Sequence, residues 1–162
     1  MAEDAARTAL DAIDRAILSA LQADGRLSNV ELAERVGLSP SPCLRRVKRL
    51  EAAGLIAGYR AALDRRALGL GLTVFVEIKV DRHSAENAAG LEAQLLALPE
   101  VVACHMVSGA ADFLAEIVVP DLAAYERLLT ARLLSLPMVQ DVRSNFALRS
   151  PLAAGPLPIP GT

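Results

Sequence analysis

Residues 29–54 read NVELAERVGLSPSPCLRRVKRLEAAG, and their pattern gives the clearest indication of how the N-terminal part of the chain folds. Apolar residues recur at helical spacing on both sides of Gly37, which predicts a short helix before the glycine and a longer one after it. Gly37 is a typical C-terminal helix signal, while Ser39 or Ser41 can cap the second helix with Pro42 in its first turn. The stretch therefore predicts two helices joined by a tight turn.

A third helical pattern precedes these two. Its apolar residues fall three and four positions apart, and Asp24-Gly25 ends it. They are Leu10, Ile13, Ile17 and Leu21. The lengths of the two later helices and the glycine turn between them are typical of a helix-turn-helix that reads double-stranded DNA.

The second helix of that pair has an apolar side and a basic side. Its apolar residues are Cys43, Leu44, Val47 and Leu50. The residues on the other side, which we predict to contact DNA, are Ser41, Pro42, Arg45, Arg46 and Arg49. Arginine can donate two hydrogen bonds to a guanine edge or bind phosphates. The alternative is a solvated helix whose arginines only keep it soluble. Arg60, Arg65 and Arg66 are either further phosphate contacts or surface charges of a linker.

Charge and composition limit the other possibilities. The chain has 162 residues, 53% hydrophobic and 3% aromatic, with a net charge of -2. Its positive charge gathers in residues 41–66, where seven Lys and Arg face two Asp and Glu. The acidic N-terminus does not resemble a signal peptide, and no apolar run is long enough to span a membrane. Two cysteines far apart in the sequence fit a reducing compartment, so we expect a cytoplasmic protein.

The second half of the chain alternates in the order β-α-β-β-α-β. The expected elements are strands over 72–81, 100–107, 112–119 and 138–148, and helices over 85–98 and 121–136. This order predicts a ferredoxin-like domain, and hence an α+β protein with an N-terminal, winged-helix-like helix-turn-helix. The expected domains are 1–60 for DNA binding, 61–71 as a linker, 72–150 for the ferredoxin-like part and 151–162 as a Pro-rich tail.

No catalytic constellation is visible, so we expect no enzyme, no cofactor and no metal. Cys104 and His105 are neighbours on a predicted strand and point to opposite faces, so they cannot chelate together. Cys43 is interpreted as a core residue. Glu77 and Glu116 could form a carboxylate pair, although a position facing solvent or a subunit interface is the favoured interpretation.

The chain resembles a known family over residues 10–149. The residues that carry the resemblance are LDAIDRAILSALQADGRLSNVELAERVGLSPSPCLRRVKRLEAAGLIAGYRAALD, GLTVFVEIKV, EVVACHMVSGAADFLAEIVVPDLAAY and LLSLPMVQDVRSNFAL. They are similar to the Lrp/AsnC, or feast/famine, transcription regulators. The resemblance implies a ligand-responsive second domain, dimers formed through the sheets that assemble to tetramers or octamers, and amino-acid effectors that control genes of amino-acid metabolism or transport.

The resemblance also implies where an effector binds. In the family, the turn after the second strand of this domain helps to hold the amino acid, which here is the turn 107–112. Gly109 can let backbone amides approach a carboxylate, and Asp112 could pair with an ammonium group; each is equally well explained as a turn residue or a turn cap. The further candidate wall residues are Met106, Leu122, Leu134 and Phe146. Ala110 and Ala111 make this turn smaller and less charged than in many relatives.

Two other functions remain as alternatives. One is an architectural protein that compacts DNA without strong sequence preference, which would bind random DNA equally well in a salt-sensitive way. The other is an enzyme or an amino-acid-binding module that uses the ferredoxin-like half alone.

Overall fold

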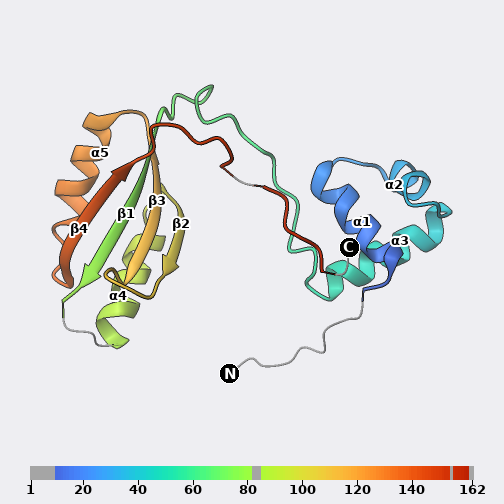
Figure 1. The fold of residues 1–162 in the computed structure, drawn as a ribbon, viewed down its shortest axis with the longest axis horizontal. Helices are drawn as coiled ribbons and strands as arrows, with labels where there is room; N and C mark the ends of the chain where they lie inside the picture. Colours follow the sequence, from blue (N-terminus) through green and yellow to red (C-terminus); the bar gives the residue numbers. More distant parts are fainter. Residues whose placement is uncertain (1–9, 82–84, 154, 161–162) are drawn as a thin grey trace. The chain divides into compact units, whose positions relative to one another are not determined.

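The computed structural model describes residues 10–81, 85–153 and 155–160 (Figure 1). The chain divides into two compact units. The first consists of Met1–Ala62 together with Leu152–Thr162, and the second of Leu63–Pro151. The C-terminal segment therefore belongs to the unit built by the N-terminal residues.

Three helices make up most of the first unit: α1 (Ala12–Ala23), α2 (Asn29–Arg35) and α3 (Pro40–Ala52). The predicted helical pattern is confirmed. Asp11 and Ser28 each begin a helix with a capping box, in which the side chain accepts from a backbone N–H three residues on. Gly37 has a φ of 70°, a left-handed conformation that favours glycine, and it turns the chain between α2 and α3.

The core of the first unit lies between the three helices. Its buried apolar residues are Ile17, Ala20, Leu32, Ala33, Cys43 and Leu50. Cys43 is fully buried, which confirms its interpretation as a core residue. After α3, Ile56 packs against this core, but residues 53–71 contain no strand, so no β-wing follows α3 within that range.

The second unit is a four-stranded antiparallel sheet with helices on one face. Its elements are β1 (Leu72–Val80), α4 (Ala85–Leu96), β2 (Val101–Met106), β3 (Phe113–Val119), α5 (Leu122–Leu128), which continues as a π-helical turn (Leu129–Leu133), and β4 (Val139–Phe146). The strand order is β2-β3-β1-β4, with antiparallel pairing throughout. The predicted β-α-β-β-α-β order and the ferredoxin-like fold are confirmed.

The two faces of the sheet differ in chemistry. Val74, Val76 and Ile78 of β1 are fully buried in one core with residues of α4 and α5, among them Leu91 and Tyr125. The intervening residues of β1 point to the other face, because side chains alternate along a strand. These residues are Thr73, Phe75, Glu77 and Lys79, and none of them is buried. This face of the sheet is therefore uncovered and carries charged side chains.

Candidate functional site

Helix α3 presents its basic residues away from the core of the first unit. Arg45 and Lys48 are exposed, Ser41 is exposed at the start of the helix, and Pro42 is half-buried. Arg45, Arg46 and Arg49 border one surface hollow. The five side chains predicted to contact DNA thus start from one helix, but the structure gives its arginines different surroundings.

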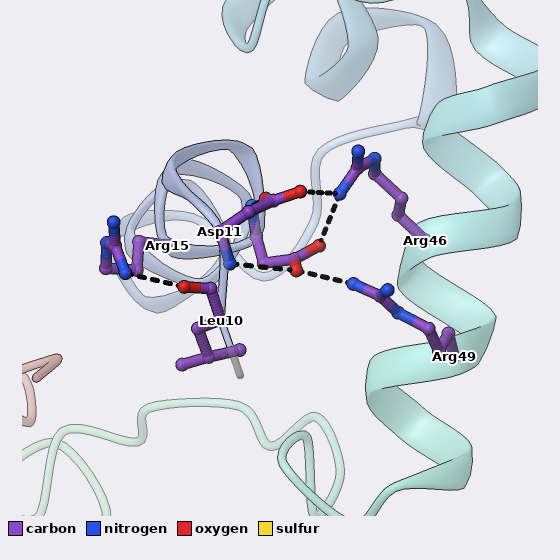
Figure 2. Close-up of polar contacts among 6 residues, drawn as sticks. Leu10, Asp11, Arg15, Arg46 and Arg49 are labelled. Carbon is purple, nitrogen blue, oxygen red and sulfur yellow. Dashed lines mark hydrogen bonds and ion pairs between the residues drawn. The ribbon is translucent and has the colours of Figure 1, made fainter. Parts of the chain in front are cut away.

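Arg46 and Arg49 pair with carboxylates of α1 and its cap (Figure 2). Arg46 Nη1 lies 2.6 Å from Asp11 Oδ2 and 2.9 Å from Asp14 Oδ1. Arg49 Nη2 donates to the other oxygen of Asp14. The Asp14 side chain is only 1% exposed, against 27% for Arg46 and 49% for Arg49. Two guanidinium groups on the helix surface therefore neutralise one buried carboxylate beneath them.

The ionisation of these groups reflects the pairing. The backbone N–H of Asp14 and the guanidinium of Arg46 both donate to the Asp11 carboxylate and hold its pKa below the usual range. The same contacts with Asp11 and Asp14 raise the pKa of Arg46. A buried carboxylate is costly unless it is paired and hydrogen-bonded, so these arginines stabilise the contact between α1 and α3.

Arg45 differs from its two neighbours. It is exposed, and within the described residues no acidic side chain pairs with it. The helix pattern of α3 alone could not separate Arg45 from Arg46 and Arg49, because the acids lie 32 and 35 residues earlier in the chain. The one available signal was the pair Asp11 and Asp14, spaced to lie at the start of a helix that packs on α3.

Among the linker arginines, Arg65 is occupied within the second unit. Its Nη1 donates to Glu116 Oε1 at 2.7 Å and to Thr73 Oγ1 at 3.3 Å. Glu116 therefore forms an ion pair with Arg65, and the structure does not place it as the partner of Glu77 in a carboxylate pair. Arg60 and Arg66 are exposed.

A second candidate site lies on the uncovered face of the sheet. A pocket of about 380 Å³ is lined by Glu77, Lys79, Ala110, Ala111, Gln140, Asp141 and Arg143. Its charged residues come from paired positions of β1 and β4, where Glu77 lies opposite Arg143 and Lys79 opposite Asp141. The pocket thus offers two cations and two carboxylates beside the turn between β2 and β3, a set that can bind a small zwitterion.

Two of the predicted effector residues, Gly109 and Asp112, lie in the turn beside this charged pocket and do not line it. Gly109 lies in the adjacent turn with a φ of 129°. Asp112 fastens that turn to β1: its carboxylate accepts from the N–H of Val80 at 2.8 Å, and its own N–H donates to Ile78 O at 3.0 Å. Asp112 therefore caps this turn, and its contact with an effector stays a prediction.

The other four predicted residues lie elsewhere in the second unit. Phe146 lies opposite Val74, on the helix-covered face, and packs edge-on against Tyr125 with ring centroids 5.6 Å apart. Leu122 on α5 is 62% exposed, and Leu134, just after the π-helical turn, is 55% exposed. Met106 on β2 is 65% exposed. None of them lines the charged pocket. Their contact with an effector stays a prediction. The charged lining was missed, although alternation along β1 places Glu77 and Lys79 opposite the buried residues.

Comparisons with known proteins bear on both units. Residues 10–57 match the winged helix-turn-helix DNA-binding family, and residues 73–157 match the Lrp/AsnC ligand binding domain. The chain belongs to the Lrp/AsnC family. It is 51% identical to the leucine-responsive regulatory protein of Salmonella typhimurium over 139 residues, which are 86% of this chain and 85% of that protein. It is 50% identical to the Escherichia coli K12 protein of the same name over equal shares.

Solved structures of Lrp/AsnC proteins share the fold. A complex of a transcriptional regulator from Neisseria meningitidis with L-Met has a TM-score of 0.89 and 40% identity, and the match covers 93% of this chain and 97% of that one. AsnC of E. coli has a TM-score of 0.83 and 26% identity, over 91% and 97%. The expectation of a DNA-binding transcription regulator with a ligand-binding domain, rather than an enzyme, is confirmed.

Metal centres and membrane-crossing helices are both missing from the described part of this Lrp/AsnC protein. Across the described ranges, no cluster of three or more His, Cys, Asp and Glu residues is arranged to hold a metal ion. Within the same ranges, no helix combines the length and the apolar character needed to cross a membrane.

Proposed function

We propose that the first unit reads double-stranded DNA mainly through Arg45, with Ser41 and Pro42 at the start of α3 setting its approach. In this proposal Arg46 and Arg49 act by holding α3 on α1. The observation that carries it is the contrast in pairing: Arg45 is exposed without an acidic partner among the described residues, whereas its two neighbours neutralise Asp14. A guanidinium that keeps its donors can form a two-bond contact with guanine in the major groove.

The test uses a duplex that the wild-type protein selects from a random pool. Arg45→Ala should weaken binding to this duplex by roughly 1–3 kcal/mol and relax its sequence preference. Arg127→Ala is the matched control, because it removes an exposed arginine from α5 in the second unit. Equal affinities of wild type and Arg45→Ala for the selected duplex would refute this role. Equal binding of selected and unrelated duplexes by wild type would instead favour DNA compaction without sequence preference.

We further propose that a free amino acid is the effector and that it binds in the charged pocket. Lys79 and Arg143 would pair with its carboxylate, and Glu77 and Asp141 with its ammonium group. The proposal is supported by the charges of the lining and by the L-Met complex of the Neisseria relative. The protein would then act in the cytoplasm on genes of amino-acid metabolism or transport, and the name of its relative, leucine-responsive regulatory protein, supports a response to an amino acid.

A thermal-shift screen of the twenty amino acids, followed by calorimetry, tests the effector proposal. For the amino acid that binds, Arg143→Gln should weaken affinity by about tenfold or more, because it removes a charge-assisted hydrogen bond. Arg149→Gln is the control, since Arg149 is exposed in the same unit and does not line the pocket. Unchanged affinity in Arg143→Gln would place the effector elsewhere.

We also propose a homodimer that assembles into tetramers or octamers. Uncovered apolar side chains on the free face of the sheet, such as the 37%-exposed Phe75, support contact with a second copy. Two copies would favour a roughly palindromic operator with half-sites one or more helical turns apart. Sedimentation equilibrium measures the assembly, and a monomer at micromolar concentration would contradict it.

A further inference from the structure

The C-terminal segment makes a specific contact with α1. The side-chain amide of Gln22 holds both backbone groups of Leu157: the N–H of Leu157 donates to Gln22 Oε1 at 2.7 Å, and Gln22 Nε2 donates to Leu157 O at 3.2 Å. The two residues lie 135 positions apart in the chain. Figure 1 shows the red C-terminal segment reaching the helices of the first unit.

The sequence around Leu157 suits this contact. Pro156 and Pro158 have no N–H to donate, so Leu157 supplies the single backbone donor of the triplet 156–158. Proline also fixes φ and favours an extended chain whose backbone groups make no internal hydrogen bonds. A glutamine side chain carries one acceptor and two donors, so it can satisfy both groups of one such residue.

The surface of α1 at this place carries two small side chains beside Gln22. Ser19, Gln22 and Ala23 line a hollow of about 780 Å³ together with residues 155–159. Ile159 is half-buried, while the side chain of Leu157 is 76% exposed. Recognition is therefore directed at the backbone of Leu157, with Ile159 as the apolar contact.

We propose that residues 155–159 form an intramolecular strap that docks on the outer face of α1 in the same chain. The chain leaves the first unit through residues 53–71 and returns to it after β4, so the docked strap adds a second attachment of the DNA-binding unit to its own ligand-binding unit. The contact is small and would be weak for a free peptide. Tethering makes docking an intramolecular event, which raises the effective concentration of the segment and favours the docked state.

Cross-linking within one chain tests the occupant of this surface. The variant Ser19→Cys/Pro158→Cys places two accessible thiols at the hollow and keeps Gln22 and Leu157 intact. It is made in a Cys104→Ser background, and the remaining native cysteine, Cys43, is fully buried. A short bis-maleimide should give mainly a cross-linked monomer. Glu34→Cys with Pro158→Cys is the control, because α2 does not line the hollow. A covalent dimer would overturn docking within one chain, and a yield no higher than the control would overturn docking itself.

Amide hydrogen exchange tests the role of Gln22. Gln22→Ala should speed exchange of the Leu157 amide by about three- to tenfold, the change expected for loss of one solvent-accessible hydrogen bond. It should also lower the cross-linking yield. Gln94→Ala, at an exposed position on α4, should leave both unchanged. Wild-type exchange in Gln22→Ala would overturn the assignment of Gln22 as the residue that holds the strap.

Removal of the strap tests its mechanical consequence. A chain that ends at Ala153 keeps β4 and both folded cores, and nitrogen-15 relaxation should show faster reorientation of α1–α3 relative to the second unit than in the full chain. Unchanged relaxation of α1–α3 would overturn the second attachment.

Discussion

One charged side chain is buried in the first unit, whereas the charges of the second unit gather at an open pocket. Asp14 is 1% exposed between α1 and α3, and among the described residues it is the one buried charged side chain. The buried cluster of the second unit is apolar apart from the hydroxyl of Tyr125. Its charges at Glu77, Lys79 and Arg143 line a surface pocket instead.

Under the proposed function, this difference gives the arginines of α3 two separate tasks. A helix that enters the negative field of DNA needs cations, and a buried carboxylate next to it needs cations as well. Arg46 and Arg49 serve the carboxylate, so the orientation of the reading helix depends on electrostatic pairing as well as on apolar packing. In the second unit, the sheet packs through apolar residues, and its pocket charges lie at the surface, where Arg143 pairs with Asp141 at 3.5 Å and Glu77 accepts from Asn145 at 3.2 Å.

The strongest test of this comparison is Asp14→Asn. The variant removes the charge that both arginines neutralise and should destabilise the first unit by about 2–3 kcal/mol, somewhat less than a fully buried pair because both arginines reach solvent. Chemical denaturation followed on amide signals of α1–α3 measures the effect. Glu34→Gln, an exposed acid on α2, should change stability by less than about 0.5 kcal/mol. An unchanged midpoint in Asp14→Asn would show that apolar packing alone fixes α3.

A second test separates the arginines from each other. Arg46→Ala removes the contacts with Asp11 and Asp14 but leaves Arg49 on Asp14, so we expect a loss of about 1–2 kcal/mol in the first unit. Arg45→Ala should stay within about 0.5 kcal/mol of wild type, because its side chain is exposed and unpaired among the described residues. The same denaturation experiment applies. Equal losses in the two variants would remove the distinction between holding and reading arginines.

The stability of the second unit should depend on an uncharged hydrogen bond, between Tyr125 and Ser144, instead of an ion pair. Tyr125 is 2% exposed, and its hydroxyl lies 2.5 Å from Ser144 Oγ. Tyr125→Phe keeps the ring contact with Phe146 and leaves Ser144 without this partner, at an expected cost of about 1 kcal/mol. Amide signals of β1 and β4 report this loss, and those of α1–α3 should not move. Destabilisation of both units together would show that they unfold as one.

Local patterns predicted the elements of both units, because each pattern lies within one element. The period of apolar residues placed all three helices of the first unit and the four strands of the second, and Gly37 marked the turn before α3. The π-helical turn at Leu129–Leu133 could not be predicted in this way, because its apolar residues continue the period of the α-helix. Only the backbone hydrogen bonds differ: the N–H of Leu134 donates to Leu129 O, five residues earlier, at 2.9 Å.

Contacts between distant segments limited the prediction of the sites. The basic side of α3 was correctly placed, but the acids that occupy Arg46 and Arg49 come from another helix, and a wheel of one helix contains no such information. The sequence also contained no sign of the hydrogen bond from Val80 N–H to the Asp112 carboxylate, because the two residues lie 32 positions apart. The contact of Gln22 with Leu157 joins segments 135 residues apart and left no local signal.

Low pH should reduce the stability of the first unit by protonating the carboxylates that cap α1 and α2. The stability lost at each cap should be smaller than the loss expected in the second unit for Tyr125→Phe. Hydrogen bonds lower the folded-state pKa of Asp11 below 3.8, chiefly from Asp14 N–H and then from Arg46, and that of Glu31 below 4.5, from Ser28. A lowered folded pKa means that the stabilisation is complete above these unfolded values and disappears as pH falls through the lower folded ones. Thermal unfolding followed on α1–α3 between pH 6 and roughly pH 2 should therefore show a decline confined to the acid end. Asp11→Asn and Glu31→Gln should each flatten that decline, since the replacement cannot titrate. If both variants lost stability at low pH as steeply as wild type, other carboxylates would cause the loss. The charges of Asp11 and Glu31 would then add nothing to the stability of the first unit.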